Sequence, residues 1–162
     1  MDDWKLPWEG GCRCGEVRFK VTEPPLLGTA CHCLGCQRMT ASAFALSLTL
    51  RESGFEITEG EPVLGGLQQQ VRHLHCPACK SWMVTRFNEP AGFMNLRPTM
   101  LDDHAWFAPF AEFQTAEKLP WAATGARHSF VRWAEAADYG RLMSEYAAEA
   151  ARPTAARSAS GG

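Results

Sequence analysis

The sequence predicts a mainly β fold with a peripheral C-terminal helix. Two observations support this class: short segments of alternating polar and apolar residues recur between glycines and prolines, and an alanine-rich segment with few helix breakers follows near the C-terminus. The chain has 162 residues, of which 46% are hydrophobic and 21% are charged, as in a soluble domain with a full core. We therefore expect one domain over residues 1–152.

The alternating segments are expected to form strands joined by short connections. Residues 1–9 form an extended lead-in, and the first strand ends at Pro24-Pro25. In chain order, the expected strands cover residues 16–21, 26–33, 42–50, 55–58, 70–75, 82–87, 92–96 and 111–115. The strand over residues 42–50 should bury one face, which carries Phe44, Leu46, Leu48 and Leu50.

Two segments favour helix. Cys36–Thr40 should form one helical turn, and Asp138–Ala151 is rich in Ala, Glu, Leu and Met, which predicts a helix. The apolar stripe of this second helix, Leu142, Met143 and Tyr146, would pack on the body of the domain. Residues 153–162 are rich in Ala, Ser and Gly and are expected to be a disordered tail.

The net charge and the N-terminal sequence argue against a nucleic-acid-binding, membrane or secreted protein. A net charge of −2 and a pI near 6.2 give no electrostatic reason to expect a nucleic acid or an anionic membrane as partner. Met1–Lys5 lacks the pattern of a signal peptide, and no apolar run reaches the length of a membrane span. Seven cysteines in such a chain suit the reducing cytoplasm, where thiols stay available for metal. The oligomeric state is left open.

Three of the cysteines form a C-x-C-x-x-C pattern at Cys31, Cys33 and Cys36. On a strand, Cys31 and Cys33 would point to the same face, and Leu34-Gly35 could turn the chain so that Cys36 returns to the same point. Three thiolates so placed can hold one zinc ion and leave its fourth position open, as catalytic zinc sites do.

The other four cysteines form two close pairs. Cys12 and Cys14 are separated by one residue, and Cys76 and Cys79 form a C-x-x-C knuckle at the tip of an expected hairpin. Four thiolates suit a closed, tetrahedral, structural zinc. Buried free cysteine would not explain three tight clusters, and one-residue spacings with an odd total argue against disulfides. We thus expect two zinc ions per chain.

Three segments resemble the glutathione-dependent formaldehyde-activating enzyme (GFA) family. They are Gly10–Phe19, Cys31–Arg38 and His75–Ser81, and the motifs spread over residues 10–121. The resemblance implies a tent-like β fold, a structural zinc on the two cysteine pairs and a second zinc on the C-x-C-x-x-C cysteines. It also implies a carbon–sulfur lyase that joins formaldehyde and glutathione to S-hydroxymethylglutathione and reverses that step.

This sequence departs from the pattern of that family at some positions. Lys80 follows Cys79 where the family usually has glycine, and Glu112 stands where a histidine is common. Thr99–Asp102 retains only the Leu-Asp of a usual Gly-x-Leu-Asp, whereas Trp121 matches the pattern.

The residues themselves favour thiol–aldehyde chemistry at the three-cysteine site, so Cys31, Cys33 and Cys36 are the candidate catalytic residues. Zinc lowers the pKa of a bound thiol, and a thiolate adds to an aldehyde carbonyl. The partners would be a small-molecule thiol and an aldehyde. The proton on the new oxygen could come from water or from a hydroxyl such as that of Ser42, because His32 should point away from the metal.

Substrate contacts leave alternatives open. Arg38 directly follows the metal loop and could bind a glutathione carboxylate through two parallel hydrogen bonds, or it could be a solvated surface residue. Lys80 is a weaker candidate. A redox enzyme would need a reactive cysteine outside the metal sites, and none remains. The alternative function is a non-enzymatic zinc-binding or thiol-binding protein, such as a carrier, with two zinc sites.

Overall fold

The computed structural model describes residues 3–67, 69–88 and 91–154 and has a mainly β architecture with a C-terminal helix, as predicted. A three-stranded sheet has the order β1-β2-β5, formed by Trp8–Gly11, Arg18–Val21 and Phe55–Glu59. An eight-stranded sheet has the order β11-β10-β3-β4-β9-β8-β7-β6. In chain order its strands are β3 (Leu27–Cys31), β4 (Ala45–Arg51), β6 (Val63–Gly65), β7 (Val71–His75), β8 (Trp82–Phe87), β9 (Phe93–Leu96), β10 (Ala111–Phe113) and β11 (His128–Ser129).

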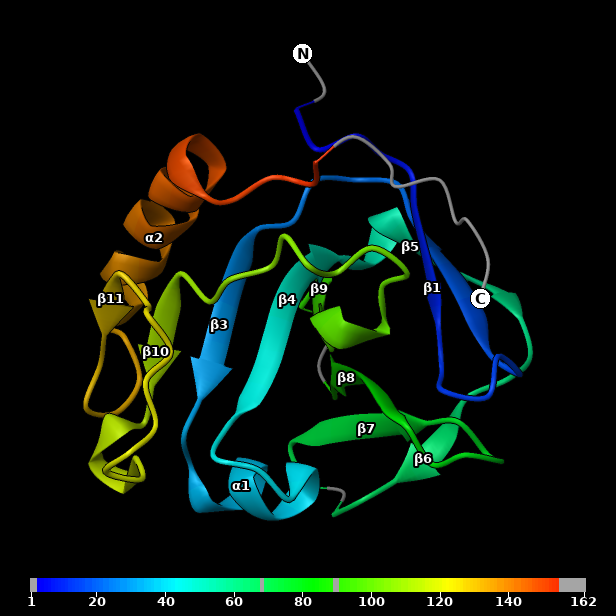
Figure 1. Cartoon of the computed structure of the whole chain (residues 1–162), viewed down its shortest axis with the longest axis horizontal. Helices are drawn as coiled ribbons and strands as arrows, with labels where there is room; N and C mark the ends of the chain where they lie inside the picture. The colour runs from blue at the N-terminus through cyan, green and yellow to red at the C-terminus, as the bar shows by residue number, and fades with distance from the viewer. Residues whose placement is uncertain (1–2, 68, 89–90, 155–162) are drawn as a thin grey trace.

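The helices are short or peripheral. Helix α1 (Leu34–Thr40) joins β3 to β4 at one end of the large sheet, and α2 (Ala136–Glu149) lies beside β10 and β11 (Figure 1). Single 3₁₀ turns occur at η1 (Glu52–Gly54), η2 (Pro98–Met100) and η3 (Thr115–Glu117). No helix in the described part of the chain is long and apolar enough to cross a membrane.

All eight predicted strands are present. Most begin or end one to three residues inside the expected bounds, whereas β8 matches them and β4 and β5 end one residue later. The expected lead-in contains a strand that the pattern did not predict, because Trp8–Gly11 pairs antiparallel with Arg18–Val21 as β1. Strands β6 and β11 were also not predicted. They have only three and two residues and lie at the two edges of the large sheet, so their sequences carry too few alternating positions to be recognised.

Both faces of β4 are covered, whereas the sequence predicted one buried face. Leu48 and Leu50 are buried on the expected apolar face, and Ala45 and Ser47 on the opposite face are buried as well. Strand β4 lies between β3 and β9, deep in the large sheet. Because Ala45 and Ser47 are buried, the face that carries them meets protein rather than open solvent. This face also matters for the site described below.

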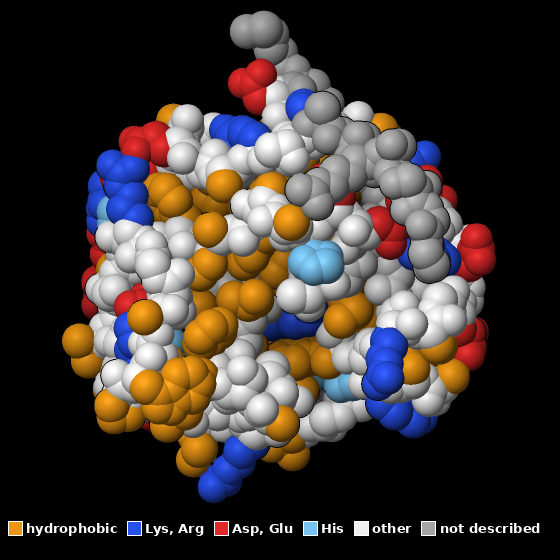
Figure 2. Space-filling model, viewed as in Figure 1, with side chains coloured by type: hydrophobic (Ala, Val, Ile, Leu, Met, Phe, Trp, Pro, Cys, Tyr) orange, Lys and Arg blue, Asp and Glu red, His pale blue; other side chains and the backbone are white. Residues whose placement is uncertain are grey.

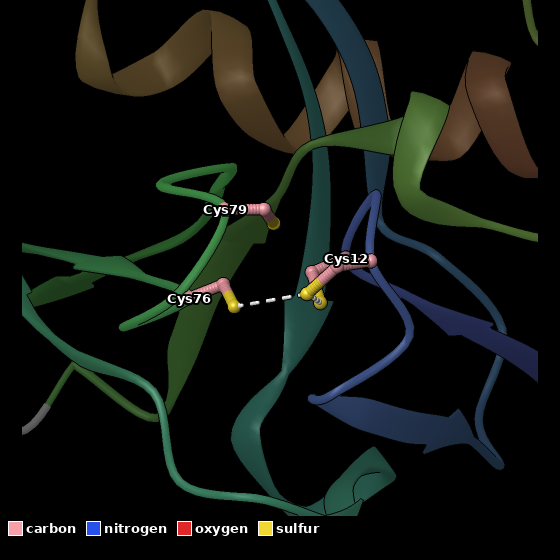
Figure 3. Close-up of side chains that lie close together, drawn as sticks. Cys12, Cys76 and Cys79 are labelled. Carbon is pink, nitrogen blue, oxygen red and sulfur yellow. Dashed lines mark hydrogen bonds between the residues drawn. The ribbon is translucent and has the colours of Figure 1, made fainter.

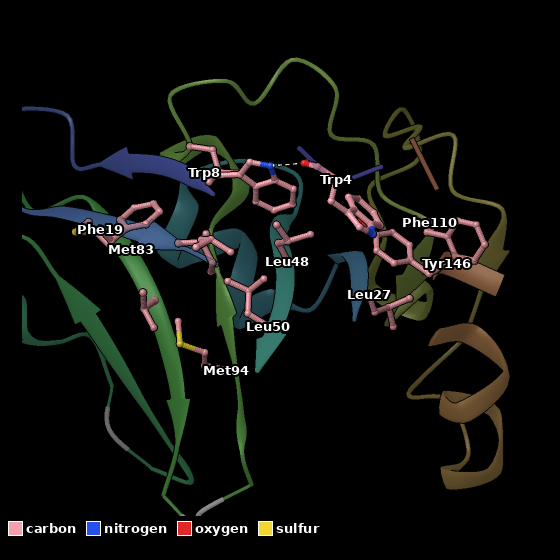
Figure 4. Packing of buried hydrophobic residues seen from close by; sticks show 14 of the residues in the cluster. Trp4, Trp8, Phe19, Leu27, Leu48, Leu50, Met83, Met94, Phe110 and Tyr146 are labelled. Atoms are coloured by element: carbon pink, nitrogen blue, oxygen red, sulfur yellow. Dashed lines mark hydrogen bonds between the residues drawn. The ribbon is translucent and has the colours of Figure 1, made fainter. Parts of the chain in front are cut away.

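The core lies between the two sheets and extends to α2. Trp4 stacks on Tyr146 of α2, with ring centroids 5.8 Å apart, and the indole of Trp8 donates a hydrogen bond to the Trp4 carbonyl at 2.6 Å (Figure 4). Leu142 and Tyr146 are fully buried and Met143 packs against the same cluster, so the predicted apolar stripe of α2 is confirmed. Each such side chain contributes about 1.5–3 kcal/mol by burial, which holds α2 against β3.

The start of the predicted tail packs on this core. The Arg152 guanidinium lies 3.7 Å from the centroid of the Trp4 ring, and Pro153 is buried. The ordered domain thus extends slightly beyond residue 152. Residues 155–162 of the predicted tail lie outside the described residues.

Candidate metal centres

Two loops that lie far apart in the sequence bring four cysteine sulfurs together. Cys12 and Cys14 belong to the loop between β1 and β2, and Cys76 and Cys79 belong to the turn between β7 and β8. Figure 3 shows Cys12, Cys76 and Cys79 close together. The four Sγ atoms all lie within 4.8 Å of one another. The Cys12–Cys14 and Cys14–Cys76 sulfur distances are 3.6 and 3.7 Å, close to the roughly 3.8 Å edge of a tetrahedron with zinc–sulfur bonds of about 2.3 Å. The donor set therefore fits a structural zinc.

The backbone of both loops is shaped to present these thiols. The Cys12 amide donates to the Val17 carbonyl, and the Val17 amide donates to the Cys12 sulfur at 3.3 Å. In the second loop the Lys80 amide donates to the Cys76 carbonyl at 3.1 Å. Lys80 has φ of +62°, a conformation that favours glycine, which gives a physical reason for glycine at this position in the family pattern. Its ammonium group donates to the Pro77 carbonyl, so Lys80 stabilises the turn rather than reaching another site.

Ser81 links the two loops. Its hydroxyl accepts a hydrogen bond from the Arg13 amide at 3.2 Å and lies 3.2 Å from the Cys79 sulfur. Hydrogen bonding by Ser81 lowers the pKa of the Cys79 thiol to about 5. A thiolate is the form that binds metal, so this contact prepares Cys79 as a ligand.

The second cluster forms at the junction of β3 and α1. Cys31 ends β3, Cys33 is the N-cap of α1, and Cys36 lies in the first turn of the helix. Their three sulfurs lie within 4.8 Å of one another. The Cys33 sulfur also accepts a hydrogen bond from the Cys36 amide at 3.3 Å, so helix capping and ligand placement use the same side chain. Hydrogen bonding by Cys36 lowers the pKa of the Cys31 thiol to about 6 and raises that of Cys36.

The η3 segment holds this ligand loop from outside. The Gln37 side-chain amide donates to the carbonyls of His32 and Glu117, at 2.7 and 2.9 Å. The Glu117 carboxylate accepts from the Leu34 amide at 2.6 Å. These bonds fix both the entry and the first turn of α1, and thus the spacing of the three thiols.

His32, between two of these cysteines, points away from the cluster, as predicted. It is fully buried and its Nε2 lies 2.8 Å from the Glu112 carboxylate on β10. Glu112 also accepts hydrogen bonds from Lys118, Thr124 and Ser129. Burial alone would raise the pKa of Glu112, but the bonds from Ser129, His32, Thr124 and Lys118 outweigh burial and lower it to about 2.

The sequence did not reveal this buried network. The family pattern has a histidine where this chain has Glu112. In the structure, the Glu112 carboxylate makes hydrogen bonds with four side chains, those of His32, Lys118, Thr124 and Ser129. Residues 32 and 112 are 80 positions apart and meet because β10 pairs parallel with β3. Only the departure from the pattern at position 112 could have drawn attention to it.

The His73 and His75 side chains pack against residues of the neighbouring strand β8. His73 lies 3.0 Å from the Thr85 hydroxyl, and His75 stacks on the Trp82 ring with centroids 6.4 Å apart. Burial lowers the pKa of both imidazoles, which favours their neutral forms. Both imidazoles thus pack within the hairpin of β7 and β8.

Arg38, the predicted substrate contact, and Ser42, the candidate proton donor, lie on the exposed side of α1 and just beyond its C-terminal end. Both line a surface groove of about 520 Å³, together with Leu34, Gln37, Ala41, Ala43, Leu119 and Trp121. Arg38 and Cys36 are two positions apart, so their side chains leave the helix roughly 200° from each other. The groove is therefore separated from the three thiols by α1 itself, and the role of Arg38 stays a prediction.

The architecture and the cysteine positions define a class of β protein with one four-cysteine cluster and one three-cysteine cluster, each able to hold a metal ion. The sequence model described as glutathione-dependent formaldehyde-activating enzyme, GFA, matches residues 7–117, and the chain belongs to this family. A crystal structure of a Rhodobacter sphaeroides protein is similar over 58% of this chain and 87% of that one, with 21% identity and a TM-score of 0.48. No curated protein matches the chain.

Proposed function

We propose that this protein is a zinc-dependent carbon–sulfur lyase that catalyses the addition of a glutathione-like thiol to a small aldehyde, such as formaldehyde, and the reverse reaction. The observation that carries the proposal is the convergence of Cys31, Cys33 and Cys36, whose sulfurs lie within 4.8 Å of one another without a fourth cysteine. Membership of the GFA family supports the same reaction class.

The three thiols of this site would hold the zinc ion, which supplies a Lewis-acid position where a substrate thiol is held as thiolate. Addition then forms a bond between the substrate sulfur and the carbonyl carbon, and the carbonyl π electrons move to oxygen. The proton lost from the thiol is balanced by one gained at that oxygen, so the product is a hemithioacetal. The donor would be water, because the Ser42 hydroxyl lines the groove on the other side of α1 from the three thiols.

The surrounding residues would keep the ligands in place during this reaction. Gln37 and Glu117 fix the ligand loop, and the contact of His32 with Glu112 anchors the residue between two ligands. Such constraints limit reorganisation, because a ligand set that is already in position needs little movement when a thiol enters.

Arg38 would bind a carboxylate of the substrate at the groove beside α1. A guanidinium binds a carboxylate through two parallel hydrogen bonds, and the groove leaves Arg38 accessible. If this is right, Arg38→Ala should raise KM for glutathione and leave KM for 2-mercaptoethanol, which has no carboxylate, nearly unchanged. An equal effect on both thiols would contradict this role.

Cobalt substitution tests the proposed function directly. Glutathione should change the visible bands and the thiolate-to-cobalt charge transfer of the three-cysteine site, whereas S-methylglutathione should change them little because its sulfur cannot become a thiolate. In Cys33→Ser the response should vanish while the bands of the four-cysteine site remain. The rate of hemithioacetal formation, measured by NMR exchange, should be higher with the zinc-loaded protein than without protein. A labile second metal without turnover would instead favour a carrier.

A further inference from the structure

Cys31 lies on a polar face of the eight-stranded sheet. It pairs directly with Ala45 across β3 and β4, and Thr29 pairs with Ser47. Directly paired residues of antiparallel strands point to the same face, so the Cys31 thiol and the Ser47 hydroxyl share one face. That face continues toward β9, where the Thr49 hydroxyl donates to the Asn95 side chain at 2.8 Å.

A buried arginine occupies this same face. Arg97, which follows β9, donates from Nη1 to the Leu46 carbonyl and the Ser47 hydroxyl, and from Nη2 to the Thr85 hydroxyl, each at 2.9 Å. Its guanidinium also lies 4.1 Å from the centroid of the Trp82 ring. Figure 2 shows a molecular face that is hollowed near its centre, with a Lys or Arg side chain visible at the floor of the hollow.

The charge of Arg97 lacks a carboxylate partner among the described residues. Arg97 is only 7% exposed, and it is the one Lys or Arg in the described part of the chain that is buried. Its contacts are to a carbonyl, two hydroxyls and a ring, and its Nε has no hydrogen-bond partner there. A buried charge is costly unless an opposite charge compensates it, so the structure needs an anion nearby.

The three-cysteine cluster supplies that anion. Burial lowers the pKa of Arg97 to about 10, and the cluster begins on the same sheet face as the Ser47 hydroxyl that Arg97 contacts. Three thiolates around one divalent ion carry a net charge of −1, and a fourth thiolate would make it −2. A fixed positive charge on the same sheet face lowers the free energy of both anionic states relative to an empty site whose three thiols are protonated.

We propose that Arg97 is the built-in counter-charge of the three-cysteine centre. It favours metal binding there and favours an anionic ligand, such as a substrate thiolate, at the open position. The effect on the fourth ligand rests on the proposed function, whereas the effect on metal affinity does not. Arg97 acts at a distance through its charge and is a positioning residue for the centre.

Metal affinity of each site in Arg97→Met measures the first effect. By competition with a chelator, the variant should bind Co²⁺ at the three-cysteine site on the order of tenfold more weakly, as expected for the loss of one charge at an effective dielectric constant near 20. The Co²⁺ affinity of the four-cysteine site should not change, and Arg97→Lys should retain most of the Co²⁺ affinity of the three-cysteine site. Arg72→Met, an exposed change on β7, is the matched control and should alter neither site.

A second pair of variants keeps the test valid if Arg97→Met does not fold. Thr85→Asp places a carboxylate against the guanidinium, and Thr85→Asn has the same shape without the charge. Thr85→Asp should weaken Co²⁺ binding at the three-cysteine site on the order of tenfold more than Thr85→Asn does. Equal affinities within this pair, or equal losses at both metal sites in Arg97→Met, would overturn the proposal and leave Arg97 with a purely structural role.

Glutathione titration of the cobalt protein measures the second effect. Arg97→Met should raise the apparent Kd for glutathione on the order of tenfold relative to the unmodified protein. If the unmodified protein shows no response to glutathione, the proposed function fails, while the metal affinities still decide the role of Arg97. If the unmodified protein responds and Arg97→Met responds with the same Kd, the counter-charge role toward the fourth ligand is wrong and the proposed function stands.

Discussion

Glu112→Gln removes the buried charge that anchors His32, and we expect it to destabilise the protein at neutral pH. The pKa of Glu112 lies near 2, against 4.5 for the unperturbed group. At about 1.36 kcal/mol for each pKa unit, this difference corresponds to about 3 kcal/mol of stability. Glutamine keeps the shape of the side chain, but its amide cannot accept all the hydrogen bonds that the carboxylate receives.

The loss should depend on pH in a defined direction. Because folding lowers the pKa of Glu112, its contribution is complete above the unfolded pKa of 4.5 and is lost as the pH falls toward 2. Urea unfolding of the unmodified protein and of Glu112→Gln should therefore differ by about 3 kcal/mol at pH 7 and by much less near pH 3. Metal loss in acid affects both proteins, so the difference between them isolates Glu112.

The control is Glu56→Gln, at an exposed position of β5, which should change the free energy of unfolding by less than about 0.5 kcal/mol. Two results would refute the reasoning. The free energies of unfolding of Glu112→Gln and the unmodified protein could differ by less than about 0.5 kcal/mol at pH 7, or their difference could fail to decrease in acid. The network around Glu112 would then be a set of surface-like contacts with no net stabilising effect.

Further predictions concern the metal sites and the core. Elemental analysis of freshly purified, reduced protein should find between one and two zinc ions per chain, and a value near zero would refute the metal assignment. Cys76→Ser should lower Tm strongly, because the metal-binding free energy of a closed site is also folding free energy. Cys33→Ser should fold nearly normally and lose only the second metal. An equal loss of Tm in both variants would refute the assignment of one structural and one functional site. Leu142→Ala should cost about 2–5 kcal/mol in urea unfolding, because it empties a fully buried position, while the same change at exposed Leu64 should cost little; similar losses would contradict the packing of α2.

The sequence by itself determined the features that depend on local spacing. Alternation of polar and apolar residues located most strands, because side chains of a strand point alternately to two faces. The C-x-C-x-x-C pattern placed Cys31, Cys33 and Cys36 together because a strand end and one helical turn bring such positions to one point. The two remaining cysteine pairs were also assigned to one site, and their sulfurs do converge.

Only the tertiary structure decided which distant residues surround these thiols. Glu112 reaches His32 because β10 pairs parallel with β3, and Arg97 reaches the face of Cys31 because β9 pairs with β4, which pairs with β3. Alternation fixes the face to which a side chain points, but the strand order decides what it meets there. That order follows from long-range pairing, so the buried carboxylate and the buried guanidinium could not be recognised from their own neighbourhoods in the sequence.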